Sequence, residues 1–312
     1  MNQQLPIIKT LSFFSIFQQP LTLLELKENL FCSAKTDLSQ LRKDLDVLIK
    51  KGAVGTTNGF FFLSPDESLV SRRLQKIFWE LPKWQIAQKA ATILNLVPFI
   101  KLVAVCNSLA FGTSREESDI DFFIVANRGH VWIVRFLANL FLRLFGLRTF
   151  KSKMTNRICL SFFVDTNHLN LQALTLPNKI DVYLHYWIAS LIPLVNRNKT
   201  LEKFWQDNFW IKENLANWNE EGRTCDYRLI KEDSWLRKIG SLAEYFLAGE
   251  LGSILENFLR LVQMEKINSR LSWKRHNKND IVIKEGFLKF HTPDKREGYY
   301  NLWQEKFSSG VE

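Results

Sequence analysis

The sequence predicts an α+β protein built from three consecutive parts. Residues 1–65 have leucines at helical spacing followed by a short β-rich hairpin pattern. Residues 66–217 contain apolar, β-branched runs that alternate with an amphipathic helix, which is typical of a mixed sheet with flanking helices. Residues 218–312 repeat apolar positions every three or four residues, which predicts a mostly helical C-terminal region with one short hairpin.

The overall composition is that of a folded protein with more than one hydrophobic core. The chain has 312 residues, of which 46% are hydrophobic and 24% are charged. The formal net charge of +10 favours a polyanionic partner such as a nucleic acid, a nucleotide or an acidic membrane surface. A basic surface that only keeps the protein in solution explains the same charge.

Cysteine usage and hydropathy indicate a cytoplasmic protein with no membrane partner. The four cysteines are Cys32, Cys106, Cys159 and Cys225. They lie far apart and form no C-x-x-C pair, so they suggest neither a zinc site nor a disulfide framework. The first ten residues do not resemble a secretory signal. The most apolar run, 131–147, is interrupted by Arg135 and Arg143, which is unfavourable for a membrane span.

The N-terminal part resembles a winged helix-turn-helix. Leucines in the third predicted helix recur at helical spacing, with Thr36 or Asp37 as the cap and Gly52 as the stop. Residues 53–63 then read as two short strands around the turn cluster from Thr57 to Gly59. In DNA readers of this fold the third helix enters the major groove. Here acidic residues are mixed with basic ones on that helix, so protein contact or a structural role stays open beside nucleic-acid binding.

The next segment, from about residue 66 to 99, is rich in basic and aromatic residues. It is predicted to form two helices broken by Pro82. The aromatic residues have helical spacing, so we expect them to pack in a core rather than to stack on a nucleic-acid strand.

Two acidic residues at the start of a predicted strand are the candidate metal ligands. Residues 101–106 read as a buried strand, and residues 118–126 read as a second one. Because side chains alternate across a strand, Asp119 and Asp121 point to the same face. Two adjacent carboxylates need a cation, and oxygen ligands of this kind suit Mg²⁺ or Mn²⁺. Asn107 and Ser108 follow the first strand, where backbone N–H groups and a hydroxyl form an anion site.

This arrangement resembles the polymerase-beta-type nucleotidyltransferase superfamily. The matching segments are "VAVCNS" and "SDIDFFIV", in the order strand, turn, spacer and alternating carboxylates. More widely, the order of an N-terminal winged helix, the Asp-x-Asp strand, "NRICLSFF" and "DVYLHYWIASLIPL" resembles bacterial proteins described as nucleotidyltransferase domain-containing. The resemblance implies a nucleoside triphosphate substrate, Mg²⁺ or Mn²⁺, metal binding by Asp119 and Asp121, and nucleotide contacts from Asn107, Ser108 and Ser118.

The chain departs from the superfamily pattern at two positions. Asn107 replaces the usual glycine, and the side chain of Asn obstructs a close approach of phosphate to the backbone. The third carboxylate is expected on a later strand, which we place at 157–165, with Asp165 as the candidate. Asp165 also fits a turn cap, and if Ser161 takes the position of the third acid the site has two carboxylates.

The remaining expectations concern the C-terminal half and the function. We expect a helix over 181–195 that ends at Pro193, helices within 236–270, a hairpin with Gly286 at its bend, and a frayed tail after Lys306. The predicted function is transfer of a nucleoside monophosphate from a nucleoside triphosphate to a hydroxyl or phosphate acceptor, with release of pyrophosphate. A nucleic acid or a protein is the expected acceptor. The alternative is a nucleic-acid-binding regulator whose nucleotidyltransferase fold has lost its chemistry.

Overall fold

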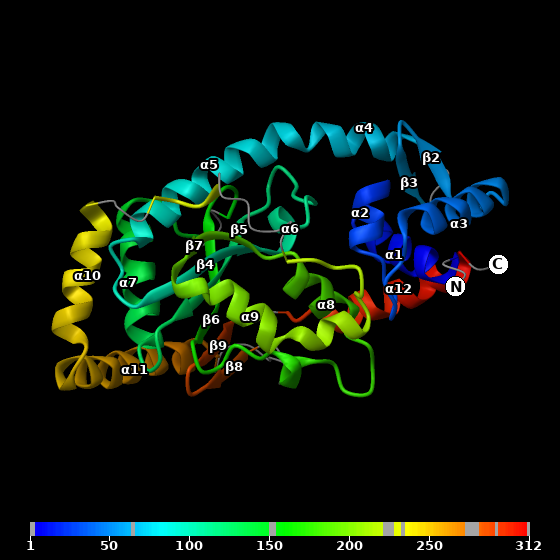
Figure 1. The fold of residues 1–312 in the computed structure, drawn as a ribbon. Helices are drawn as coiled ribbons and strands as arrows, with labels where there is room; N and C mark the ends of the chain where they lie inside the picture. Colours follow the sequence, from blue (N-terminus) through cyan, green and yellow to red (C-terminus); the bar gives the residue numbers. More distant parts are fainter. Residues whose placement is uncertain are drawn as a thin grey trace.

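A computed structural model of the chain describes residues 4–63, 66–149, 154–220, 228–231, 235–271, 281–290 and 293–310. Helices surround a mixed six-stranded sheet, and a smaller three-stranded sheet lies near the N-terminus (Figure 1). The predicted α+β class and the mixed sheet are therefore confirmed. Within the described residues, no helix combines the length and the apolarity that crossing a membrane requires.

The N-terminal elements follow the order expected from the sequence. They are α1 (Gln4–Ile16), β1 (Leu21–Thr22), α2 (Leu23–Glu28), α3 (Leu38–Lys50), β2 (Gly55–Thr57) and β3 (Phe60–Phe62), and the strands pair in the order β1-β3-β2. Helix α2 begins at a capping box between Thr22 and Glu25. Asp37 caps α3, because its carboxylate accepts from the Ser39 N–H at 2.9 Å.

The connecting helices are α4 (Ser68–Gln75) and α5 (Ile77–Leu94), and they separate at Lys76 rather than at Pro82. The predicted break at Pro82 is wrong, since this proline lies inside α5. Proline removes the bond that its N–H would donate to the carbonyl of Phe78. The Phe78 side chain is 76% exposed, so this side of the helix faces water, which can hydrogen-bond the carbonyl instead.

The central sheet has the strand order β7-β4-β5-β6-β9-β8. The strands are β4 (Ile100–Cys106), β5 (Ile120–Ala126), β6 (Ile158–Asp165), β7 (Ile192–Asn196), β8 (Ile281–Lys284) and β9 (Phe287–Phe290). Strands β5 and β6 are parallel, and the other neighbours are antiparallel. Helix α7 (Val131–Leu144) connects β5 to β6, as a parallel pair requires. Gly286 bends the predicted hairpin of β8 and β9, which extends the sheet beyond β6.

Two hydrophobic cores cover the two faces of the sheet. Val103, Phe122 and Phe163 point toward the core formed with α5, α7 and α11 (Glu250–Leu271). Ala104, Phe123 and Phe162 point toward the other core, which contains α8 (Val182–Ala189) and α9 (Thr200–Asp207) and continues into the N-terminal helices. The N-terminal elements therefore share a core with the sheet.

The helix predicted over 181–195 is only partly correct. Helix α8 ends at Ala189, and the chain then enters β7, which contains Pro193. This strand lies at the edge of the sheet and pairs with β4. Proline lacks the N–H that a central strand must donate, so it is tolerated at an edge.

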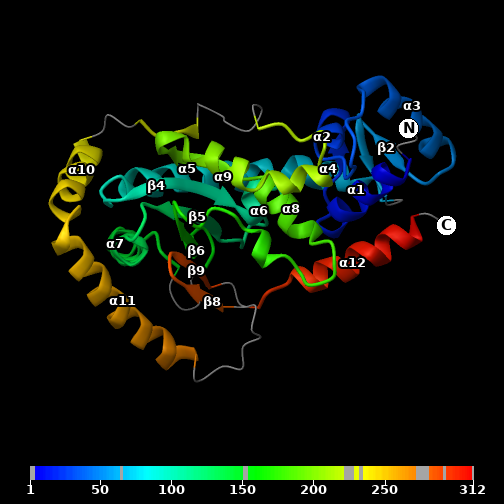
Figure 2. The same cartoon turned by 60° about the horizontal axis from the view of Figure 1, so that its bottom comes forward.

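The C-terminal helix α12 (Arg296–Ser309) returns to the beginning of the chain (Figure 1). Trp303 is 2% exposed, and its indole N–H donates to the carbonyl of Lys9 in α1 at 2.9 Å. The prediction of a frayed tail after Lys306 is wrong, because the helix continues to Ser309 while packing on α1. Between α9 and α12 lie α10 (Trp235–Leu247) and α11 at the opposite end of the molecule (Figure 2).

Candidate metal centre

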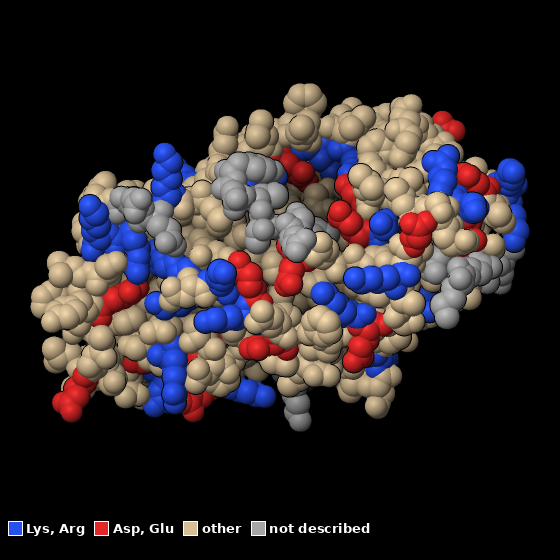
Figure 3. Space-filling view, in the orientation of Figure 1, with Lys and Arg blue, Asp and Glu red and all other residues tan. Residues whose placement is uncertain are grey.

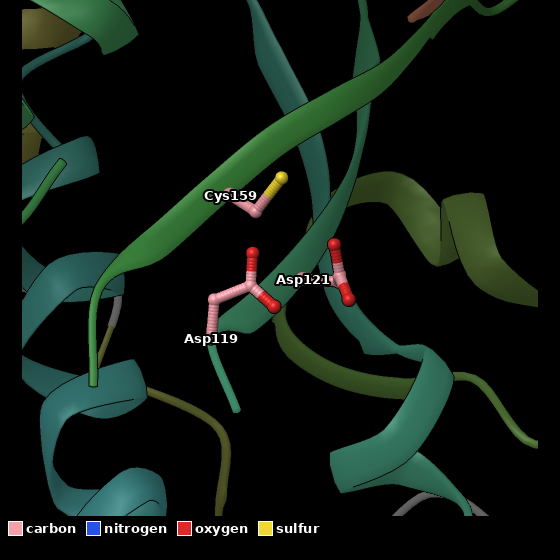
Figure 4. A group of neighbouring side chains, drawn as sticks. All are labelled: Asp119, Asp121 and Cys159. Carbon is pink, nitrogen blue, oxygen red and sulfur yellow. The ribbon is translucent and has the colours of Figure 1, made fainter. Parts of the chain in front are cut away.

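Asp119, Asp121 and Cys159 converge at one end of β5 and β6. One potential ligand atom of each residue lies within 4.8 Å of the others. Figure 4 shows the two carboxylates beside each other at the start of β5, with the thiol of Cys159 on the neighbouring strand. The predicted convergence of Asp119 and Asp121 is therefore found in the structure, and Cys159 joins them.

Strand register explains how the thiol reaches this place. Asp121 pairs with Cys159 on the parallel strand β6 and with Cys106 on the antiparallel strand β4. Residues paired across neighbouring strands project on the same face of the sheet. The Asp121 carboxylate therefore lies between two cysteines.

Burial controls the protonation of this group of side chains. Asp121 is 8% exposed, and burial raises its pKa, although hydrogen bonds from Asn107 and Cys159 act in the opposite direction. Burial also raises the pKa of the Cys106 and Cys159 thiols well above the usual value. Without a bound cation, both cysteines are neutral thiols at neutral pH.

Asn107 has the backbone conformation that glycine favours, with φ of 55°. Its side-chain oxygen accepts from the Tyr183 hydroxyl at 3.1 Å and from the Trp187 indole N–H at 2.8 Å. Because both of these bonds use the oxygen, the amide nitrogen is the group that bonds to Asp121. Asn107 thus meets the backbone requirement of this turn and also orients a carboxylate.

Lys83 in α5 holds the loop that precedes Asp119. Its side chain is fully buried, and Nζ donates to the carbonyl oxygens of Glu116 at 3.0 Å and Ser118 at 2.8 Å. A third bond, of 2.6 Å, reaches the side-chain oxygen of Asn156 in the segment that leads into β6. One ammonium group therefore connects the approaches to both strands of the site.

A cavity of about 400 Å³ opens beside Asp121. Its wall includes the predicted contact residues Asn107, Ser108 and Ser118. Helix α6 (Asn107–Ala110), which starts here, has four residues, so its dipole is small. The Ser118 hydroxyl accepts from the Arg115 N–H at 3.0 Å and closes the loop ahead of Asp119.

Residues near the C-terminus line the same cavity and give it a cationic side. Lys289 on β9 lies 2.7 Å from Asp294, and Arg296 lies 2.8 Å from both Asp294 and Asp181. Lys295 and Arg115 line the cavity and are exposed. Sequence reasoning missed Lys289, Lys295 and Arg296, because the hairpin and the start of α12 reach the cavity through tertiary packing.

Asp165 does not join the centre. It pairs with Ala126 at the far end of β5, whereas Cys159 pairs with Asp121 at the near end. A register shift between Phe122 and Phe123 also marks a bulge in this ladder, which changes the face on which later residues project. The Asp165 carboxylate instead accepts from the N–H of Gly129 at 3.3 Å and of Asn167 at 3.0 Å, and lies 2.7 Å from His168. These contacts hold the turn after β6, and the prediction of Asp165 as the third carboxylate is corrected.

The bulge also explains why Cys159 escaped notice. Sequence alternation placed Cys159, Ser161, Phe163 and Asp165 on one face. In the structure Phe163 belongs to the same core as Ile158 and Leu160, so the alternation that starts at Cys159 holds only up to the bulge. Pairing Asp121 with the beginning of β6, rather than with its end, would have identified Cys159.

The donor set decides which cations fit. Two carboxylates suit Mg²⁺ or Mn²⁺, whereas a thiolate is a softer ligand that favours ions such as Zn²⁺. The half-buried guanidinium of Arg148 hydrogen-bonds Cys159, and its positive charge offsets part of the negative charge of Asp119. Asp119 and Asp121 therefore fit the predicted ions, and Cys159 extends the range toward softer ones.

Comparison of the chain with protein-family models, with curated proteins and with solved structures finds no significant match in any of the three.

Proposed function

We propose that the protein is a metal-dependent nucleotidyltransferase that moves a nucleoside monophosphate from a nucleoside triphosphate to a hydroxyl or phosphate acceptor. The observation that carries the proposal is the convergence of Asp119, Asp121 and Cys159 beside a cavity of about 400 Å³. This volume is in the range of small-molecule sites. The N-terminal unit, with its order of helices and its β1-β3-β2 sheet, supports the accompanying assignment of a winged helix-turn-helix.

Each group of cavity residues has a distinct task in this proposal. Asp119 and Asp121 would hold the divalent ion, and Asn107 would keep the Asp121 carboxylate oriented. When bound, the ion stabilises the charge that develops on phosphate oxygens during in-line displacement. Ser108, Arg115 and Lys295 offer donors to the triphosphate from the cavity wall.

The test combines binding and turnover. The protein is incubated with each of the four ribonucleoside triphosphates and Mg²⁺ or Mn²⁺, and release of pyrophosphate is measured. We expect Asp121→Asn to abolish release, because the amide removes a charged ligand. Asp165→Asn is the matched control on β6 and should retain release if its thermal transition shows that it is folded. No turnover and no nucleotide binding with any metal would reject the proposal.

One observation favours the alternative of a nucleic-acid-binding regulator. Asn107 stands where the superfamily pattern leads us to expect a glycine, and the third side chain of the cluster is a cysteine rather than an acid. Against it, Arg42 on α3 is paired with Asp46 at 3.1 Å, and Figure 3 shows basic side chains interspersed with acidic ones rather than gathered in one field. Duplex-DNA binding that weakens with salt and is lost in Lys43→Glu and Lys50→Glu would support the alternative.

A further inference from the structure

Helices α10 and α11 each present a row of apolar side chains to solvent, whereas Leu259 and Ile267 of α11 are buried against the core. The outward side chains are between 44% and 80% exposed: Trp235, Ile239, Leu242, Tyr245, Phe246, Leu251, Ile254, Phe258, Leu261 and Val262. The two helices lie along the outer edge of the molecule, remote from α1 to α3 (Figure 2), and much of the surface over α10 in Figure 3 is uncharged.

Specific polar contacts fix this orientation. In α11, Glu256 accepts from the backbone N–H groups of Trp132 and Ile133, each at 2.8 Å, and so caps the start of α7. Gln263, also buried, donates to the carbonyl of Trp132 at 3.0 Å. These bonds, together with the burial of Leu259 and Ile267 against the core, fix the outward direction of the exposed apolar row of α11.

The same holds for α10. Glu244 accepts from the backbone N–H of Phe99 at 2.7 Å and from Arg237 at 3.0 Å. A Cβ at Gly240 would lie 2.6 Å from the carbonyl oxygen of Asn95, so this side of α10 touches the backbone after α5. The apolar face of α10 therefore points away from the protein as well.

The outward residues have the spacing of a helix-packing seam. Trp235, Ile239, Leu242 and Phe246 are separated by four, three and four residues. Leu251, Ile254, Phe258 and Leu261 are separated by three, four and three. This is the pattern of helices that pack against other helices in bundles and coiled coils.

The area is that of a protein interface. Ten large apolar side chains exposed to this degree present on the order of 1,000 Å² of surface. Monomers seldom expose more than a few hundred Å² in one patch, whereas a stable interface buries about 800 Å² on each partner.

We propose that α10 and α11 form the interface of a homodimer, in which two copies pack these helices against each other around a two-fold axis. The exposed charged residues in the described part of these helices are mixed in sign: Lys238, Glu250, Arg260, Glu265 and Lys266. A mixed pattern can complement itself across a two-fold axis. A helix that binds anionic lipid is rich in basic residues on its polar face, which these helices are not.

The experiment measures the mass of the full chain by sedimentation equilibrium over a range of concentrations. We expect a dimer whose dissociation constant rises by roughly 100-fold or more in Leu242→Glu and in Phe258→Glu, because each dimer contains two copies of the buried charge. Leu24→Glu is the matched control, since Leu24 is 62% exposed and Leu242 is 59% exposed. Circular dichroism should show that all three variants are folded, because each site is exposed in the single chain.

Three results would overturn the proposal. The first is a wild-type monomer at every concentration. The second is a dimer that neither Leu242→Glu nor Phe258→Glu weakens. The third is wild-type protein that is monomeric in solution and floats with phosphatidylglycerol vesicles in a manner lost in Phe258→Glu, which would assign the face to a lipid surface.

Discussion

Asp121 and Cys159 are paired in register on the parallel strands β5 and β6, so a half-buried thiol lies beside the buried carboxylate that lines the cavity. Both groups have a pKa raised by burial, which keeps the thiol neutral and hydrogen-bonded to the carboxylate. A cation that displaces the thiol proton would obtain one soft ligand and two hard ones. The choice of metal therefore depends on this pair.

Replacing the thiol should change the metal preference. We expect Cys159→Asp to bind Mg²⁺ roughly tenfold more tightly than the wild type, because affinity rises with the number of charged oxygen ligands. Cys159→Ser should lose affinity for Zn²⁺ without gaining affinity for Mg²⁺. Titration calorimetry with each metal measures both effects. Equal affinities in all three proteins would mean that residue 159 is not a ligand.

The side chain of Asn107 should contribute more to stability than its unfavourable φ costs. In Asn107→Gly the Tyr183 hydroxyl and the Trp187 indole N–H lose their acceptor, so we expect a loss of about 2 kcal/mol in the free energy of unfolding. Asn58→Gly is the control, because Asn58 has φ of 51° in the exposed turn between β2 and β3. That change should stay within about 0.5 kcal/mol of the wild type. Urea denaturation distinguishes the two variants, and equal effects would contradict the assigned role of the carboxamide.

Lys83 should be required for both the fold and the metal centre. Methionine fills a similar volume but leaves the carbonyls of Glu116 and Ser118 without their buried donor. We expect Lys83→Met to lose about 3 kcal/mol of stability and to bind Mn²⁺ more weakly, because the loop before Asp119 is released. Lys89→Met, at an exposed position in α5, is the control and should change neither quantity. Unchanged Mn²⁺ binding in a folded Lys83→Met protein would separate this lysine from the site.

His185 should make stability depend on pH. Burial lowers its pKa below the usual 6.5, and its ring nitrogens already face the Asp181 carbonyl at 2.8 Å and the Asn214 amide at 3.2 Å. The unfolded chain therefore binds a proton at a higher pH than the folded protein does. The contribution of His185 to stability is complete above its pKa in the unfolded chain. It decreases as the pH falls from 6.5 toward the pKa of His185 in the folded protein. Denaturation curves at several pH values should show that decrease, and His185→Gln should reduce it. A slope unchanged by the substitution would assign the pH dependence to other groups.

The sequence alone determined the local elements and the carboxylate pair. The leucine spacing of α3, a cap at Thr36 or Asp37 and the bend at Gly286 are properties of a few neighbouring residues. The projection of Asp119 and Asp121 toward one spot follows from alternation across two positions. Such features depend on the geometry of the chain over one or two turns, so a pattern of residues is sufficient to predict them.

Tertiary packing decided the rest. The pairing of β6 with β5, which lies about forty residues earlier in the chain, sets Cys159 beside Asp121. The bulge in the same pairing keeps Asp165 away from the metal centre. Pro193 entered a strand because β7 lies at the sheet edge, and the C-terminal residues reached the cavity because α12 packs on α1. The outward direction of the exposed apolar rows of α10 and α11 was fixed by contacts of the half-buried Glu244 and the buried Glu256. These outcomes depend on partners distant in sequence, whose positions local spacing does not encode.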